Sequence, residues 1–134
     1  MKAVLLSAHV ILAILAVGPI AVAASIFPRY AETPGGPVLH RICVTYTAVG
    51  VAVPMLGVAT AVAMGVLTDA WVLVSIALTA IAAAVLALAI LPAQRVALNG
   101  GGVGRLAMTT GVFNLLWVAV TILMIVRPGS STGV

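Results

Sequence analysis

Few side chains in this sequence could do chemistry, and His9 is the clearest candidate among them. It lies in an apolar, uncharged stretch over residues 3–26. At ~1.5 Å per residue, the roughly six residues between His9 and the centre of that stretch span ~9 Å, which keeps the side chain inside a hydrocarbon core ~30 Å thick. An ionisable group at that depth is costly and marks a candidate functional site. A neutral imidazole there could bind haem iron or another metal, relay a proton, or hydrogen-bond a neighbouring helix.

Other polar side chains in the apolar stretches are expected near His9 or at a similar depth. Asn114 falls near the middle of the last stretch, where its amide would bridge two helices or contact a substrate or cofactor. We expect a polar layer that holds the helices together, formed by His9, Thr60, Ser75, Thr79, Asn114 and Thr121.

The remaining reactive side chains are far apart along the chain. His40 falls near the opposite membrane face from His9, so the two cannot be axial ligands of one haem within a single chain. Cys43 is the only cysteine, which excludes an internal disulfide and a CxxC motif. Glu32 and Asp69, the only acids, fall in loops on opposite faces, so no carboxylate pair serves acid–base catalysis. The sequence predicts no catalytic residue and no metal site.

Four long apolar stretches must position these residues. The chain of 134 residues is 64% hydrophobic and 6% charged, whereas soluble domains carry about a quarter charged residues. Lipid must therefore surround most of the surface. We expect one all-α domain over residues 1–134, a bundle of four transmembrane helices over residues 3–26, 39–67, 71–91 and 105–126.

Prolines and glycines set the expected ends and kinks of these helices. Pro19 predicts a kink in the first helix, residues 27–30 end it, and Pro54 lies in the middle of the second. Pro92 is expected to end the third helix. The glycine-rich segment that follows, over residues 93–104, reads as a flexible linker, because no strand precedes it and its spacing does not fit a phosphate loop.

Small residues predict the closest pair of helices. In the second helix, small residues and Pro54 recur every three or four positions and share one face. The small residues are Gly50, Gly57, Ala61 and Gly65. Such a stripe lets another helix approach closely. The loop over residues 68–70 is very short, so the second and third helices form an antiparallel hairpin in which Asp69 can cap the third. We expect these two helices to be the tightest pair.

The positive charges predict the orientation. They occur singly, without a basic run, so a nucleic-acid partner is not expected. The first and third loops are flanked by Arg29, Arg41, Arg95 and Arg105, and the other face carries Lys2 and Arg127. The positive-inside rule places the first and third loops in the cytoplasm and both termini outside. The composition is rich in Ala, Val and Gly, with Arg in excess of Lys, which suggests a bacterium with a GC-rich genome. We therefore expect the protein in a bacterial cytoplasmic (inner) membrane. The first apolar stretch exceeds the ~7–15-residue core of a secretory signal, so we expect it to be retained.

Two short motifs carry a family resemblance. They are Ser7-Ala8-His9-Val10-Ile11-Leu12-Ala13, followed by Gly18 and Phe27-Pro28-Arg29-Tyr30, and the turn Leu67-Thr68-Asp69-Ala70-Trp71. With the length and helix count, they resemble small bacterial four-helix proteins described only as predicted integral membrane proteins. The opening is also similar, more distantly, to a bacterial membrane protoporphyrinogen oxidase family, whose first-helix histidine would correspond to His9 as a haem ligand. The chain lacks that family's tryptophan in the first helix and its cationic residue in the third, which argues against the oxidase activity and leaves haem binding open.

Taken together, the sequence favours a non-enzymatic function. The leading hypothesis is a small membrane protein that acts through helix–helix contacts, as an accessory or assembly subunit. Its partners would be the lipid bilayer and either further copies of the chain or a larger membrane complex, and it would need no cofactor. The alternative is a haem-binding redox or porphyrin-handling protein that holds haem b through His9. A small-solute transporter ranks third, because Pro19 and Pro54 could unwind helices around a site.

Overall fold

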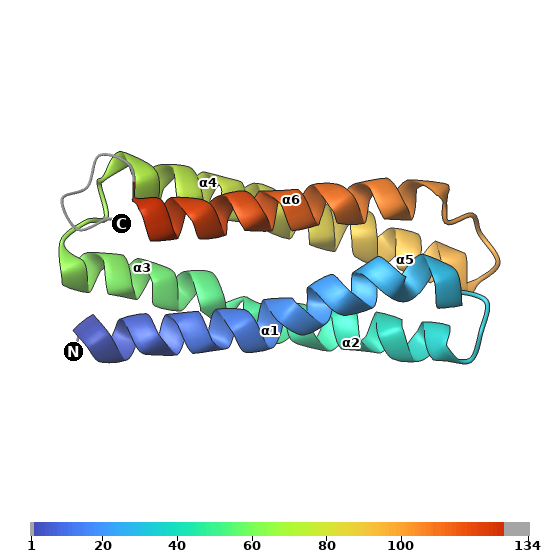
Figure 1. Ribbon diagram of the computed structural model, residues 1–134. Helices are drawn as coiled ribbons and strands as arrows, with labels where there is room; N and C mark the ends of the chain where they lie inside the picture. Colours follow the sequence, from blue (N-terminus) through green and yellow to red (C-terminus); the bar gives the residue numbers. More distant parts are fainter. Residues whose placement is uncertain (1, 128–134) are drawn as a thin grey trace.

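The chain folds into long helices, and its described part contains no β-strand. The computed structural model describes residues 2–127. Figure 1 shows the helices running antiparallel along one axis. The elements in order are α1 (Lys2–Tyr30), α2 (Gly35–Gly50), α3 (Ala52–Met64), α4 (Ala70–Val85), the π-helical turn η1 (Leu86–Ile90), α5 (Leu91–Leu98) and α6 (Gly104–Val126).

These elements combine into four spans that are long and apolar enough to cross a membrane. The shortest has 23 residues, and a bilayer core needs about 20. Together the spans confirm the all-α prediction and suggest a multi-pass membrane protein. They are Ala3–Tyr30, Gly35–Met64, Ala70–Leu98 and Gly104–Val126, and an 18-residue stretch within each has a mean hydropathy of 2.6, 1.9, 2.7 and 2.0, respectively.

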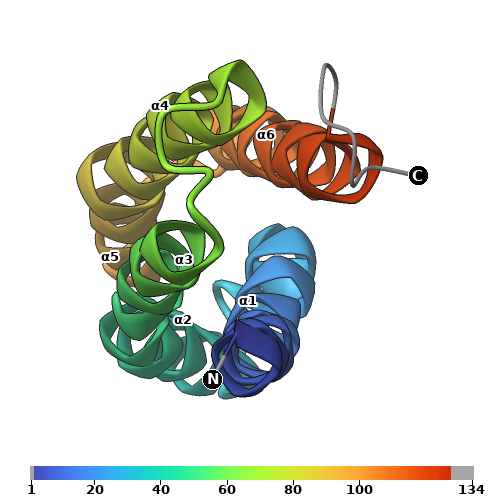
Figure 2. The same ribbon diagram turned by 90° about the vertical axis from the view of Figure 1, so that its left-hand side faces the viewer.

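The spans form a bundle with two different ends. The loops over residues 31–34 and 99–103 lie together at what we call the two-loop end (Figure 1). The start of α1, the end of α6 and the α3–α4 connection lie at the other, terminal end. Viewed from the terminal end, the four spans are arranged around the bundle axis in chain order, so that α1 and α6 are the first and last of the series (Figure 2).

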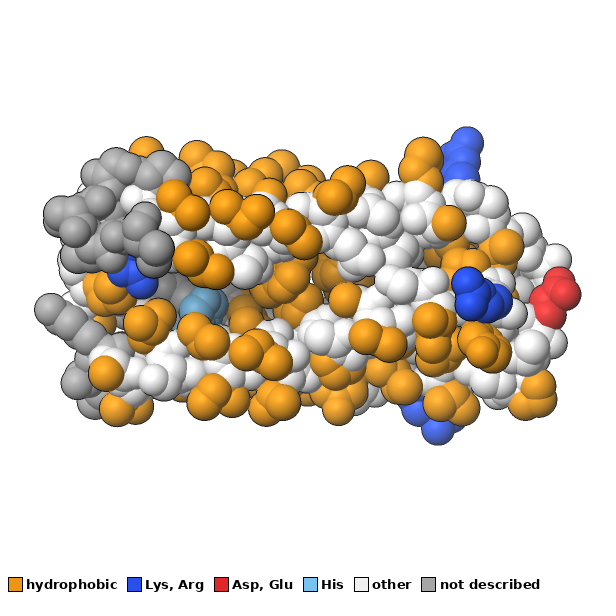
Figure 3. Space-filling model, viewed as in Figure 1, with side chains coloured by type: hydrophobic (Ala, Val, Ile, Leu, Met, Phe, Trp, Pro, Cys, Tyr) orange, Lys and Arg blue, Asp and Glu red, His pale blue; other side chains and the backbone are white. Residues whose placement is uncertain are grey.

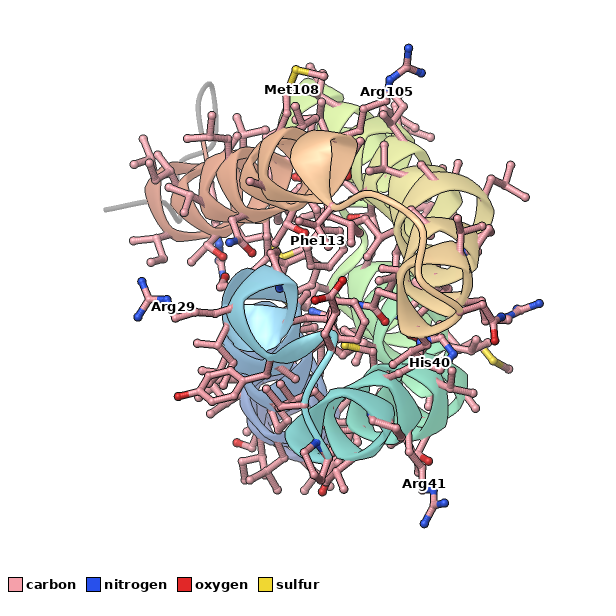
Figure 4. All side chains as sticks on the ribbon, turned by 90° about the vertical axis from the view of Figure 1, so that its right-hand side faces the viewer. Arg29, His40, Arg41, Arg105, Met108 and Phe113 are labelled. Atoms are coloured by element: carbon pink, nitrogen blue, oxygen red, sulfur yellow. The ribbon has the colours of Figure 1, made fainter. Side chains whose placement is uncertain are left out.

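The hydrophobic core is larger toward the two-loop end. Its main cluster includes the fully buried Phe27, Ile90 and Leu106. Phe113 belongs to the same cluster and points into the middle of the bundle (Figure 4). A much smaller cluster around Trp71 occupies the terminal end. The core therefore fixes the two-loop end more firmly than the terminal end.

The ends of the first two spans differ from the expected ones. The first helix continues through Pro28 to Tyr30, because a transmembrane helix tolerates a proline when neighbouring groups satisfy the carbonyl that it frees. The second begins at Gly35 instead of residue 39, with Pro37 in its first turn, where no amide hydrogen is needed. It ends at Met64, because Gly65 adopts a left-handed conformation with φ 71°.

The two mid-span prolines act in different ways. Pro54 divides the second span at Val51, between α2 and α3, because its missing N–H removes one helical hydrogen bond. Pro19 stays within the continuous helix α1, which changes direction along its length in Figure 1.

The expectation that Pro92 ends the third helix is wrong. The helix passes from α4 through η1 into α5 and ends at Leu98. Pro92 falls in the first residues of α5, directly after the π-helical turn. A π-helical turn shifts the hydrogen-bond register, so the missing donor of Pro92 is accommodated without breaking the helix. The connecting loop therefore shrinks to residues 99–103.

The expected tightest pair of helices is also wrong. The dominant contacts join α1 to α2 and α3, and α4 to α6, whereas α3 and α4 touch little. The small-residue stripe accounts for this, because Gly50 and Gly57 face α1. Only Ala61 packs toward α4, in the cluster around Trp71. Gly65 caps α3, and a Cβ there would meet no neighbour. Asp69 occupies the N-cap position of α4, but its side chain makes no capping hydrogen bond.

Candidate functional site

His9 lies on the face of α1 that packs against α3. Its Nδ1 is 2.9 Å from the carbonyl oxygen of Val53, and the side chain is 8% exposed. Because a carbonyl only accepts, Nδ1 donates this hydrogen bond, and in the neutral ring Nε2 holds the lone pair. Gly57 provides the space for the ring, since a Cβ at that position would lie 2.9 Å from Cε1 of His9.

The hydrogen bond between His9 and Val53 is compatible with a structural role for the histidine and with a metal-binding role. A buried histidine needs a hydrogen-bond partner, and Val53 supplies one. A metal-binding histidine also commonly donates its second ring N–H to a backbone carbonyl, which fixes the ring and leaves the other nitrogen for the metal. The geometry of His9 therefore meets both requirements.

The expected polar layer does not form as a network between helices. Thr60, Ser75 and Thr121 each donate to the carbonyl four residues earlier in their own helix, at 2.7, 2.7 and 2.9 Å. Thr79 is half-buried on α4. Serine and threonine hydroxyls readily satisfy themselves in this way. None of these hydrogen bonds reaches His9, whose partner is a backbone group.

Asn114 bridges two helices, but away from His9. Its Nδ2 donates to Oγ of Ser25 at 3.1 Å and so joins α6 to α1. The Oδ1 atom of Asn114 is buried and has no hydrogen-bond partner in residues 2–127, and the same holds for Oγ1 of Thr110 one turn earlier. This region thus holds unsatisfied hydrogen-bonding capacity beside the α1–α6 contact.

A second polar cluster lies at the two-loop end and was not anticipated. Nδ1 of His40 is 2.8 Å from Oε1 of Gln94, and Nε2 of Gln94 donates to Sγ of Cys43 at 3.5 Å. Gln94 is 0% exposed. The ring centroid of Phe27 lies 6.5 Å from that of His40. The amide of Gln94 therefore joins α5 to two side chains one turn apart on α2.

The π-helical turn is what places Gln94 here. Because the helix continues past Pro92, Gln94 lies inside α5 and is directed at α2. Figure 4 shows His40 between α2 and α5. The sequence signal was a single glutamine two residues after a proline, in a segment expected to be a loop. Placing it required knowing that the helix does not stop.

The two histidines belong to separate sites, as the sequence predicted. His9 packs on α3 toward the terminal end, and His40 bonds α5 at the two-loop end. Across residues 2–127, no three His, Cys, Asp or Glu side chains come together as a metal site. Comparison of the chain with protein-family models, curated proteins and solved structures gave no match.

Proposed function

We propose that this chain is a non-enzymatic membrane protein that binds another transmembrane helix, as an accessory or assembly subunit. The supporting observation is the incomplete contact between α1 and α6. These helices are joined by the Asn114–Ser25 hydrogen bond. Toward the terminal end they lie apart in Figures 1 and 2, and Figure 3 shows the surface hollowed between them. We call this hollow the α1–α6 furrow.

The walls of the furrow follow from helical periodicity. Residues spaced by seven or eleven share one helix face. The face of α1 that carries Ser25 continues toward the terminal end through Gly18, Ile14, Ile11 and Ser7, all of which are exposed. The face of α6 that carries Asn114 continues through Val118, Thr121 and Ile125, which are also exposed. The faces of α1 and α6 that meet at Ser25 and Asn114 are therefore left uncovered between that contact and the terminal end.

The composition of these walls suits a helix. In lipid, helices associate by close packing, which small residues permit. A Cβ at Gly18 would meet nothing within 4 Å, so a partner helix could approach the backbone there. Ser7 and Thr121 add hydroxyl groups on the two walls. The furrow thus offers an additional helix a closer contact than a smooth apolar face would.

A substitution at Gly18 tests this proposal without disturbing the bundle. Gly18→Leu fills open space and replaces a poor helix former, so folding should be preserved. Photo-crosslinking from Thr121 in native membranes should capture a membrane partner or a second copy, and Gly18→Leu should abolish that product. Ala80→Leu, at an exposed position on α4, is the matched control and should have no effect. Equal crosslinking in all three proteins would refute the proposal.

Haem binding at His9 is a second candidate. The hydrogen bond from Nδ1 to Val53 favours it, because that bond would orient the ring for coordination through Nε2. His9 would hold the haem through Nε2, and a bound haem would supply one-electron transfer. Visible spectra of the oxidised and reduced protein test this idea. A Soret band that is lost in His9→Ala would support it, and a colourless protein from haem-supplied cells would exclude it.

We also propose that the protein lies in a bacterial inner membrane with the two-loop end in the cytoplasm. The support is the four arginines at that end, against Lys2 and Arg127 at the other. Reporter fusions within the loop over residues 99–103 and after residue 134 test the orientation. A reporter active only in the cytoplasm should be active in the loop and inactive at the C-terminus. The reverse pattern would overturn the assignment.

A further inference from the structure

The two-loop end carries one arginine from each of the four spans. All four are exposed, and they are Arg29, Arg41, Arg95 and Arg105. Figure 4 shows three of them, Arg29, Arg41 and Arg105, directed outward on different sides of the bundle. In Figure 3 the blue side chains of the two-loop end lie close to one level along the long axis. We call these four residues the arginine belt.

The belt is not neutralised by the protein itself. Among the described residues, no side chain makes a hydrogen bond or ion pair with any of the four guanidinium groups. The only acid at this end is Glu32 in the first loop, because Asp69 lies at the other end of the bundle. The belt therefore presents an excess of positive charge to whatever surrounds it.

The directions of the side chains identify what surrounds it. A folded protein partner would approach from one side and could not reach arginines that point away from each other. Lipid headgroups encircle a membrane protein and reach all sides at one level. The belt lies where the apolar spans end, and long cationic side chains there extend toward the headgroups. A guanidinium group binds phosphate oxygens in pairs, with better geometry than an ammonium group.

We propose that the arginine belt binds the phosphates of anionic phospholipids in one leaflet, so that the protein carries an anionic lipid shell at its two-loop end. This inference does not depend on the α1–α6 furrow or on a partner helix. Each cationic residue near an anionic membrane surface increases the affinity of the protein for that surface by a factor of about five.

Native mass spectrometry of the purified protein tests the proposal. The protein is equilibrated in detergent with equal amounts of phosphatidylglycerol and phosphatidylcholine of the same acyl chains. The ratio of the two lipids retained is then measured. Wild type should retain mainly phosphatidylglycerol, each single Arg→Gln variant should lower the ratio by up to about five-fold, and the quadruple Gln variant should bring it near one.

Two controls separate the belt from general charge and from loss of folding. Lys2→Gln removes a cation at the terminal end and should leave the ratio unchanged. The quadruple Arg→Lys variant keeps the charge and should retain most of the preference, and circular dichroism should show unchanged helix content in every variant. A ratio near one in wild type, an unchanged ratio in the quadruple Gln variant, or an equal loss in Lys2→Gln would each overturn the proposal. So would a tightly bound acidic protein in place of lipid.

Discussion

The contact between His9 and Gly57 predicts a strong energetic coupling between these two positions. A methyl group at Gly57 would lie 2.9 Å from Cε1 of His9, which is too close. The ring cannot simply turn away, because its Nδ1 is held by the carbonyl of Val53 at 2.9 Å. Gly57→Ala must therefore either strain the packing of α1 on α3 or break that hydrogen bond.

The size of the effect can be estimated from its parts. Overpacking a well-packed site costs ~1–3 kcal/mol, and replacing glycine by alanine in a helix stabilises it by ~1 kcal/mol. Gly57→Ala should then destabilise wild type by ~0–2 kcal/mol. His9→Ala loses a hydrogen bond worth ~0.5–1.5 kcal/mol together with the packing of the ring. Once the ring is absent, Gly57→Ala should become neutral or stabilising, so the coupling energy should be ~1–3 kcal/mol.

A double-mutant cycle measures this coupling. Wild type, the two single variants and the double variant are unfolded reversibly with SDS in mixed micelles, followed by circular dichroism. Gly18→Ala is the matched glycine control, because its new methyl group meets nothing and should act independently of His9. Additivity of His9→Ala and Gly57→Ala within ~0.5 kcal/mol would refute the packing described here.

The same unfolding assay tests three further predictions. Gly36→Ala should cost ~1–3 kcal/mol or more, because its Cβ would lie 2.6 Å from a backbone oxygen. Gly35→Ala, whose nearest neighbour is at 3.5 Å, should stay within ~0.5 kcal/mol. Equal effects of the two substitutions would contradict the geometry at the start of α2. Gln94→Leu should cost ~1–3 kcal/mol, because it leaves Nδ1 of His40 without its partner; a neutral result would show that water replaces the amide. Asn114→Leu should cost only about 0.6 kcal/mol, the average for a hydrogen bond between membrane helices, and a cost above ~2 kcal/mol would mean that this bridge holds the bundle together.

The number of spans and their approximate positions could be predicted from the sequence, because hydropathy averages over some twenty residues. The ends of the helices could not. Pro28 and Pro92 were both expected to end a helix, and both lie inside one. In lipid an unpaired backbone group is so costly that the chain continues the helix where it can. A proline is therefore a weaker stop signal in this chain than in a soluble protein.

The candidate sites were predictable only in part. His9 could be identified because a histidine is rare in an apolar span, but its partner could not, because the carbonyl of Val53 carries no side-chain signal. Gln94 was missed because its burial depends on the π-helical turn before Pro92. A polar residue can be placed at a depth from its position in a helix, but the direction in which it points depends on how the helices rotate against each other.

The small-residue stripe shows why the sequence predicted the wrong pair of packed helices, and it sharpens the proposed function. Periodicity predicts that a face is closely approached, but it does not say by which helix. The space beside Gly57 is already filled by the ring of His9 from the same chain, so this face of α3 is not available to a partner. Gly18 is open. It follows that Gly57→Leu should unfold the bundle and lose every partner indirectly, whereas Gly18→Leu should lose the partner from a bundle that remains folded. Only the second result identifies a surface for association.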